Sequence, residues 1–211
     1  MTQERQLARV LDKARRLEHI YEARIFHRLD EVPMQAFSCR EHLRKPPADA
    51  AYHPIKAGDV WGGEWESLWL HGTYTVPAHL ADRPLYVMPR LGGWEGFLFL
   101  DGTPHAIFTN KYTTETHGNH YVARITPGAP AGTALQLDFE YYAGHYIPGC
   151  APFEDSGLKD CRHTYEGVYI AERDEEILRF VMDLRVLNSL AKATPQDSFR
   201  RGDVVRCLYD V

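Results

Sequence analysis

The stretch from Gly58 to Tyr142 constrains the fold more than any other part of this chain. From Trp69 to Val76, and again from Leu135 to Tyr141, apolar and polar residues alternate. A period of two is the pattern of a β-strand with one face in a core. Short segments of this kind, separated by glycine and proline, predict an antiparallel sandwich or jelly roll instead of a parallel sheet.

A hairpin is predicted within the same stretch. The segments Phe97–Leu100 and His105–Thr109 flank the dipeptide Asp101-Gly102. Asp-Gly supplies the two residues with positive φ that a type I′ turn requires. We therefore expect the two segments to pair as antiparallel neighbours.

Both ends of the chain carry helical periodicity. Residues 4–29 predict one amphipathic helix ended by Pro33, and a second helix begins near Ala171 and ends at Pro195. A last helix is expected from Phe199 to Tyr209. Isolated helices of this length are marginal in water. We therefore predict that the terminal helices pack together or across a homodimer and bury Leu184 and Leu187.

These patterns divide the chain into four parts. Residues 1–33 form the N-terminal helix and residues 34–57, with several prolines, form an extended linker. Residues 58–170 form the β-sandwich. Residues 171–211 form a helical segment that leads towards a catalytic barrel absent from the chain.

Composition excludes several classes of function. The net charge is -5, and the basic residues are scattered, so binding of nucleic acid through a basic face is not expected. No run of about 18 apolar residues occurs, so no membrane partner is expected. No apolar signal-peptide core follows the N-terminus, and the cysteines form no C-x-x-C pair. A cytoplasmic protein with reduced thiols is the resulting expectation.

One zinc site can be drawn from the sequence. His145, Cys150, Cys161 and His163 are residue types that bind zinc. Their spacing matches no common zinc ribbon or finger, and cysteines and histidines in loops usually hold no metal. We therefore expect no metal site on this chain.

Several short motifs occur in a characteristic order. Gly58-Asp59-Val60-Trp61-Gly62-Gly63 comes first, then a strand with Trp69 that ends in Thr75-Val76-Pro77, then a Gly-Gly segment and the Asp-Gly turn, then Asn119-His120, and last an acidic helix. In this order and spacing the chain resembles the N-terminal region of family 38 glycoside hydrolases, the α-mannosidases. The resemblance runs over nearly the whole chain.

The resemblance implies a mainly-β fold. The expected domain is an antiparallel β-sandwich or jelly roll of the galactose-binding-like type, flanked by N- and C-terminal α-helices. In the family it precedes a catalytic barrel, in which His and Asp residues hold zinc and an aspartate is the nucleophile. The H-x-H-x-D metal signature does not occur in this sequence, since His117 and His120 are separated by Gly118-Asn119. We therefore expect no catalytic residue and no cofactor on this chain, with zinc in the catalytic domain of the parent enzyme.

The tryptophans are the candidate site residues. Trp69 lies within an alternating strand and is expected in the core, because aromatic side chains dominate sandwich cores through the area they bury. Trp61, Trp65 and Trp94 lie beside glycines, where loops carry function. For these three, burial and contact with a carbohydrate or with the catalytic barrel remain alternatives.

Three functions follow from these observations. The leading interpretation is a non-catalytic N-terminal domain of an α-mannosidase-like glycoside hydrolase, which supports the barrel and oligomer assembly in carbohydrate metabolism. The alternative is a stand-alone carbohydrate-binding jelly-roll module. A free-standing hydrolase is disfavoured by the missing metal signature. The expected partners are the catalytic domain, a glycan and further copies of the chain.

Overall fold

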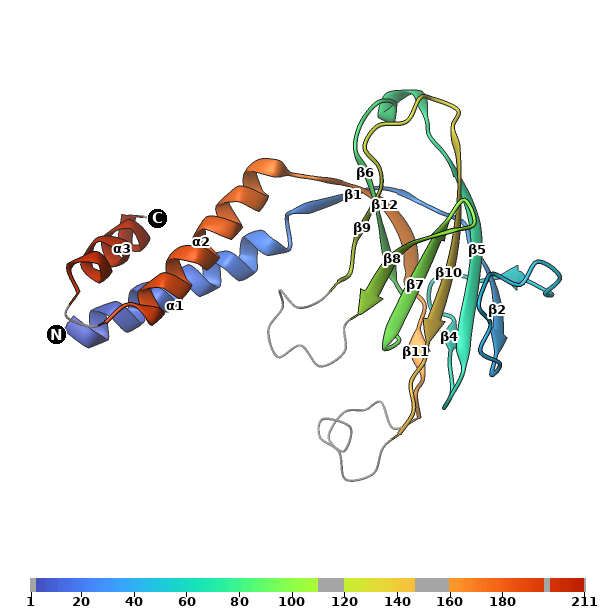
Figure 1. Cartoon of the computed structure of the whole chain (residues 1–211), viewed down its shortest axis with the longest axis horizontal. Coiled ribbons are helices and arrows are strands. Elements are labelled where there is room, and N and C mark those ends of the chain that lie inside the picture. The colour runs from blue at the N-terminus through green and yellow to red at the C-terminus, as the bar shows by residue number, and fades with distance from the viewer. Residues whose placement is uncertain (1–2, 110–119, 147–159, 196–197, 211) are drawn as a thin grey trace. The chain divides into compact units, whose positions relative to one another are not determined.

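The chain forms two compact units. The computed structural model describes residues 3–109, 120–146, 160–195 and 198–210. One unit combines Met1–His27 with Arg173–Val211 and contains the helices, and the other, Arg28–Glu172, contains the sheets (Figure 1).

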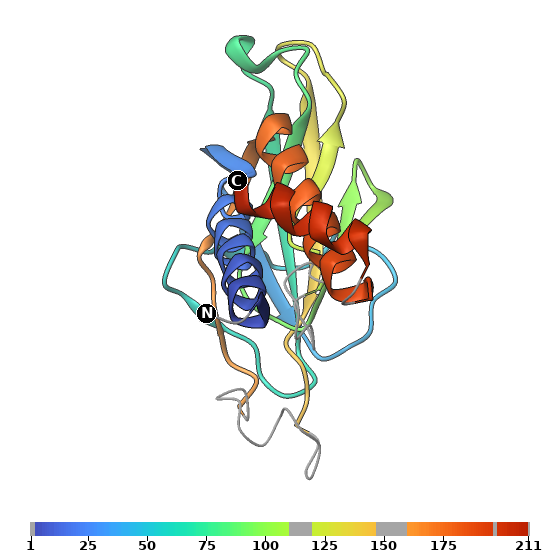
Figure 2. The ribbon, with the colours of Figure 1, turned by 90° about the vertical axis from the view of Figure 1, so that its left-hand side faces the viewer.

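The helical unit joins the two ends of the chain. Its helices are α1 (Gln3–Glu22), α2 (Glu175–Ala193) and α3 (Phe199–Asp210), and α1 and α2 run antiparallel side by side (Figure 2). Their shared core is made of Val10, Ala14, Leu184, Ala191, Val204 and Leu208. Leu184 is 2% exposed, and Leu187 packs partly buried against the same core. The prediction that the terminal helices pack together is therefore confirmed.

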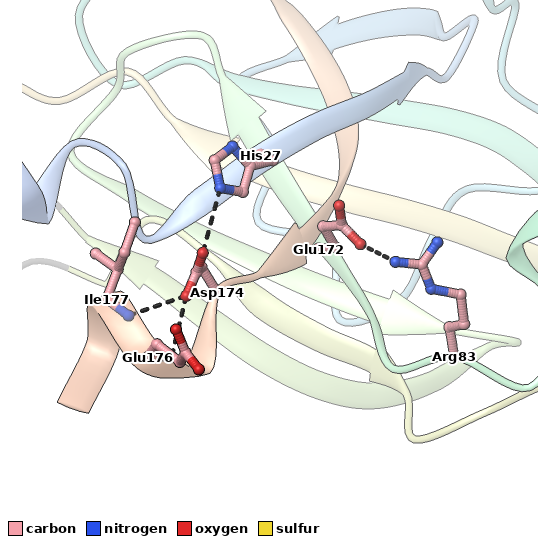
Figure 3. A network of polar contacts seen from close by, with 6 residues as sticks. All are labelled: His27, Arg83, Glu172, Asp174, Glu176 and Ile177. Atoms are coloured by element: carbon pink, nitrogen blue, oxygen red, sulfur yellow. Dashed lines mark hydrogen bonds and ion pairs between the residues drawn. The ribbon is translucent and has the colours of Figure 1, made fainter.

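The start of α2 is fixed by an N-cap. One carboxylate oxygen of Asp174 accepts hydrogen bonds from the backbone N–H groups of Glu176, at 3.0 Å, and Ile177, at 2.9 Å (Figure 3). The other oxygen lies 3.9 Å from Nε2 of His27. This cap satisfies N–H groups that have no partner inside the helix and places a negative charge at the positive end of the helix dipole. Within the described part of the chain, every helix is too short or too polar for a transmembrane span.

The β unit contains two main sheets and a short ribbon. Its elements are β1 (Phe26–Glu31), β2 (Gln35–Cys39), β3 (His53–Pro54), β4 (Val60–Trp61), β5 (Ser67–Thr75), the 3₁₀ turn η1 (Ala78–Leu80), β6 (Leu85–Arg90), β7 (Glu95–Leu100), β8 (Thr103–Thr109), β9 (Ala123–Thr126), β10 (Ala134–Tyr142), β11 (His163–Thr164) and β12 (Gly167–Arg173). The strand orders are β1-β12-β6-β9, β3-β2-β5-β10-β7-β8 and β11-β4. An ion pair between Arg83 and Glu172 joins the loop before β6 to β12 (Figure 3).

The core lies between the two main sheets. Val87 and Ile170 from the four-stranded sheet belong to the same buried cluster as Leu70, Leu137 and Phe139 from the six-stranded sheet. Neighbouring strands of the six-stranded sheet pair antiparallel throughout. The predicted fold class, an antiparallel β-sandwich with helices at both ends, is confirmed.

The predicted hairpin is also confirmed. β7 and β8 pair antiparallel around the turn at Asp101-Gly102. Both turn residues have positive φ, +49° for Asp101 and +74° for Gly102. These are the backbone conformations that a type I′ turn needs and that Asp-Gly tolerates.

Three boundaries differ from the prediction. The second helix, expected from near Ala171, begins at Glu175, because residues 171–173 complete β12. The first helix ends at Glu22, and the residues expected to complete it form β1. The segment 34–57 is not only a linker, because β2 pairs with β5 from Gln35↔His71 to Cys39↔Ser67 and β3 pairs with β2. β1 and β2 are held by partner strands distant in sequence, β12 and β5, and local periodicity does not reveal such partners.

Trp69 is buried on the side of the sheet that faces away from the sandwich core. Its neighbours Leu68 and Leu70 belong to that core, and side chains alternate along a strand, so Trp69 points to the opposite face. It is nevertheless 0% exposed and lies 6.0 Å, between ring centroids, from Phe99. The prediction that Trp69 is buried is confirmed, but its cluster is a second, outer one.

Candidate functional site

Aromatic side chains gather where three strands of the six-stranded sheet meet the loops. β10 is antiparallel to β5 and to β7, and its last residue, Tyr142, pairs with the first residue of each, Ser67 and Glu95. The starts of β5 and β7 therefore lie at the same end of the sheet as the end of β10. This register brings four aromatic side chains to that end of the sheet, which we call the aromatic end: Trp65, Trp94, Tyr142 and His145.

His145 is the centre of the aromatic end. The Trp65 indole stacks on its imidazole, with ring centroids 4.1 Å apart and planes 10° from parallel. The Trp94 ring lies 5.1 Å from the same imidazole. The Tyr142 hydroxyl and Nδ1 of His145 form a hydrogen bond of 2.7 Å. Three rings thus fix the orientation of one histidine.

Backbone hydrogen bonds hold these rings in place. The Trp65 N–H donates to the Gly144 carbonyl, and the Ala143 N–H donates to the Glu66 carbonyl, each at 2.9 Å. The Trp94 N–H donates to the Tyr142 carbonyl at 2.9 Å. The two loops that carry the tryptophans are therefore both tied to the chain that follows β10.

Gly144 is required by this arrangement. Its φ is +113°, and a Cβ on it would lie 2.4 Å from Cε2 of Trp94. Trp65 itself has a φ of +64°, which is uncommon for a bulky residue. Backbone strain of this kind is concentrated at functional sites.

Trp65 is the exposed ring of the aromatic end, whereas Tyr142 and His145 are half-buried and Trp94 is buried. The side chain of Trp65 is 58% exposed, whereas Trp94 is 4% exposed. His145 covers one face of the Trp65 indole, so the exposed surface of Trp65 is a flat aromatic platform at this end of the sheet.

Carboxylates lie close to the aromatic end. Glu64 is exposed, and its carboxylate accepts a hydrogen bond of 3.3 Å from the Tyr146 N–H. Burial raises the pKa of Tyr142 to about 12, and the charges of Cys161, Glu64 and Glu95 add to the shift. The Tyr142 hydroxyl therefore keeps its proton at neutral pH.

The structure separates the predicted tryptophans. Trp65 and Trp94 lie together around His145, whereas Trp61 is 4% exposed and packs in the sandwich core. Nε1 of Trp61 donates to the Leu91 carbonyl at 2.7 Å, and its ring lies 5.1 Å from that of His163. The open alternatives are thus resolved in favour of burial for Trp61 and Trp94 and of exposure for Trp65. Carbohydrate contact stays a prediction.

The sequence did not indicate the partners of Trp65. The predicted alternation stops at Tyr141, one residue before Tyr142, and the sequence suggests only a zinc-ligand role for His145. The usable signal was the antiparallel pairing of β10 with β5 and β7, which places the residues after β10 beside those before the two other strands.

The residues of the drawn zinc site have other roles. Cys150 lies outside the described residues. Nε2 of His163 and the Ala143 carbonyl form a hydrogen bond of 2.7 Å, and burial lowers the pKa of His163. Cys161 is buried, and burial raises the pKa of its thiol, which disfavours the thiolate that binds metal. In the ranges that the structure describes, no group of three or more His, Cys, Asp and Glu residues is placed to hold a metal ion.

A second polar cluster lies on the outer face of the six-stranded sheet. Asp138 is 1% exposed, and its two carboxylate oxygens contact Nδ1 of His71, at 2.6 Å, and Nε2 of Gln136, at 2.7 Å. Glu140, two residues along β10, accepts a hydrogen bond from the Ser67 hydroxyl at 3.3 Å, and burial raises its pKa. Both oxygens of Asp138 are occupied within the protein, so this cluster is suited to holding strands together.

Comparisons with known proteins give a fold likeness and no family. No known family model and no curated protein matches the sequence. Among solved structures, the β-glucuronidase of Faecalibacterium prausnitzii is similar at 14% identity and a TM-score of 0.43, over 72% of this chain and 32% of that one. The β-glucuronidase of Ruminococcus gnavus is similar at 12% identity and a TM-score of 0.45, over 71% of this chain and 28% of that one.

The likeness is restricted to part of the fold. The chain spans less than a third of the length of these enzymes. They are glycoside hydrolases of a specificity other than the one that the sequence resemblance implies. At such identities and TM-scores, neither their activity nor their substrate extends to this chain.

Proposed function

We propose that this chain is a non-catalytic β-sandwich domain that binds carbohydrate through the aromatic end. The observation that carries the proposal is the Trp65 platform, an indole 58% exposed and stacked on His145. The C–H face of a sugar ring fits a large flat aromatic ring that is open to water. The surrounding carboxylate and backbone groups can accept hydrogen bonds from sugar hydroxyls.

The finer proposal concerns the parent protein. We propose that the domain belongs to an α-mannosidase-like glycoside hydrolase. The order of motifs from Gly58 to the acidic helix supports this proposal.

Exposed apolar side chains on α2 favour a partner for the helical unit: Met182, Val186 and Leu190, at four-residue spacing, are 47%, 60% and 38% exposed. We propose that copies of the chain associate through this surface. Light scattering on the purified chain measures whether they do. A strict monomer would contradict it.

The non-catalytic part of the proposal follows from sequence. The H-x-H-x-D signature that accompanies the resemblance is missing. A retaining glycosidase also needs two carboxyl groups about 5 Å apart across the scissile bond. Zinc-dependent hydrolysis of an aryl mannoside by the purified chain would refute this part.

Binding is tested through Trp65. Trp61, Trp69 and Trp94 are 4%, 0% and 4% exposed, so quenching of tryptophan fluorescence by acrylamide reports mainly on Trp65. Oligosaccharides should bind with Kd values of about 1 mM, since one stacked ring is a small interface. We expect them to protect the fluorescence from quenching and to shift the amide signals of residues 64–66 and 144–146.

Matched variants decide whether the platform is the site. Trp65→Ala should weaken binding at least about ten-fold, given the area that one aromatic ring buries. Tyr209→Ala removes an aromatic ring of similar exposure, 61%, from the helical unit and should leave affinity unchanged. Equal affinity of Trp65→Ala and the unchanged protein would remove the aromatic end from carbohydrate binding.

A further inference from the structure

A carboxylate lies next to the Trp65 platform at the aromatic end. Glu64 is adjacent to Trp65 in the chain, and its side chain is fixed by the hydrogen bond from the Tyr146 N–H. That bond places its carboxylate beside the segment that carries His145. The platform and the charge are therefore held by the same pair of loops.

Other groups at this end act in the same direction. Glu95 starts β7, directly after Trp94, and pairs with Tyr142 across the strands. Asp160 precedes Cys161, and the charges of Glu64 and Asp160 both raise the pKa of that buried thiol, after burial itself. Three carboxylates of the described residues therefore add negative charge near the aromatic end: Glu64, Glu95 and Asp160.

We propose that the aromatic end selects sugars that carry an ammonium group, such as units of a 2-amino-2-deoxy-hexose, over neutral sugars and over uronic acids. This inference rests on the proposed carbohydrate binding. An ammonium group near the indole face of Trp65 is attracted by the ring quadrupole as well as by Glu64. A uronate carboxylate meets repulsion from the same glutamate.

The expected preference is moderate. A cation over an exposed tryptophan and an exposed ion pair each change affinity only a few-fold. Together they predict that a glucosamine oligomer binds about three- to ten-fold more tightly than its N-acetylated counterpart. The preference should shrink when the ionic strength is raised to about 0.5 M, because exposed charges are then screened.

The experiment compares three tetrasaccharides on the full chain: glucosamine, N-acetylglucosamine and galacturonic acid. Glu64→Gln keeps a carbonyl oxygen that can accept from the Tyr146 N–H, so the loop is retained while the charge is lost. We expect this variant to lose most of the preference for the amino sugar over the neutral tetramer. Glu31→Gln, which removes one charge from β1 in the other sheet, is the matched control and should keep the preference.

The outcomes separate the two proposals. If the neutral tetramer binds through Trp65 and the amino sugar has no advantage, or if Glu64→Gln leaves the advantage intact, the charge preference is wrong and carbohydrate binding stands. Tight binding of the galacturonate tetramer contradicts the preference in the same way. If no tetramer protects Trp65 from acrylamide, both proposals are overturned.

Discussion

Replacing Gly144 by alanine tests how the fold holds the aromatic end together. Two costs are expected. Alanine at a φ of +113° carries backbone strain of about 1 to 3 kcal/mol. A Cβ placed 2.4 Å from Cε2 of Trp94 must also displace a ring that is 4% exposed, and such overpacking costs about 1 to 3 kcal/mol. We therefore expect Gly144→Ala to lower the free energy of unfolding of the β unit by about 2 to 6 kcal/mol.

A second glycine separates the two costs. Gly58 has a φ of +98°, and a Cβ on it would meet no atom within 4 Å, so Gly58→Ala measures backbone strain alone. Urea unfolding followed by tryptophan fluorescence reports on the β unit, because all four tryptophans lie within it. The extra loss in Gly144→Ala is the contribution of the contact with Trp94.

The contact with Trp94 is isolated by a double-mutant cycle. Trp94→Ala removes the ring that the new Cβ would strike, so Gly144→Ala should cost at least about 1 kcal/mol less in that background. Equal losses for the substitutions at Gly144 and Gly58, or additive effects of Gly144→Ala and Trp94→Ala, would refute the account of the aromatic end given above.

Two further predictions concern buried polar groups. His71→Ala should lower the free energy of unfolding by about 2 kcal/mol, because it leaves the Asp138 carboxylate, 1% exposed, without one of its partners. The same substitution should cost less in an Asp138→Asn background, and an equal cost would contradict the coupling between the two side chains. Burial lowers the pKa of His163, so the unfolded chain binds a proton more readily than the fold, and stability is lost as pH falls below 6.5, the ordinary value. His163→Gln, which can still donate to the Ala143 carbonyl, should lose less stability between about pH 7 and pH 5 in urea unfolding, and an unchanged slope would contradict that assignment.

Local sequence patterns correctly predicted the elements that are determined by their own residues. β5 and β10 carry the alternation of a half-buried strand, and the Asp101-Gly102 turn carries its own φ preference. The acidic first turn of α2 likewise identified that helix, and Asp174 indeed caps it. In each case the information lies within a few residues of the element.

The missed elements depend on distant partners. β1 is polar along most of its length and is a strand because it lies beside β12. β2 lies between β5 and β3, and its pairing with β5 is the reason why residues 35–39 are extended. No periodicity in residues 26–39 distinguishes these strands from a helix end and a linker.

The aromatic end shows the same division between local and distant causes. Sequence analysis selected Trp65 and Trp94 from their neighbouring glycines, which is a local signal. That His145 lies between them follows only from the register of β10 with β5 and β7. The burial of Trp61 depends on the Leu91 carbonyl and the His163 ring, which are also remote in sequence.

The backbone around Trp65 bears on how a ligand would bind. Trp65 is held at a φ of +64° by a hydrogen bond to Gly144, and the ring is stacked on a histidine that is itself bonded to Tyr142. A side chain already fixed in this way loses little rotamer freedom when a ligand covers it, and lost side-chain freedom is one of the larger costs of binding. The sugar contact proposed for this single exposed indole therefore relies on a conformation that is set before the ligand arrives. The same reasoning predicts that Gly144→Ala, by disturbing the backbone that bonds to Trp65, lowers the affinity of the proposed site for sugar.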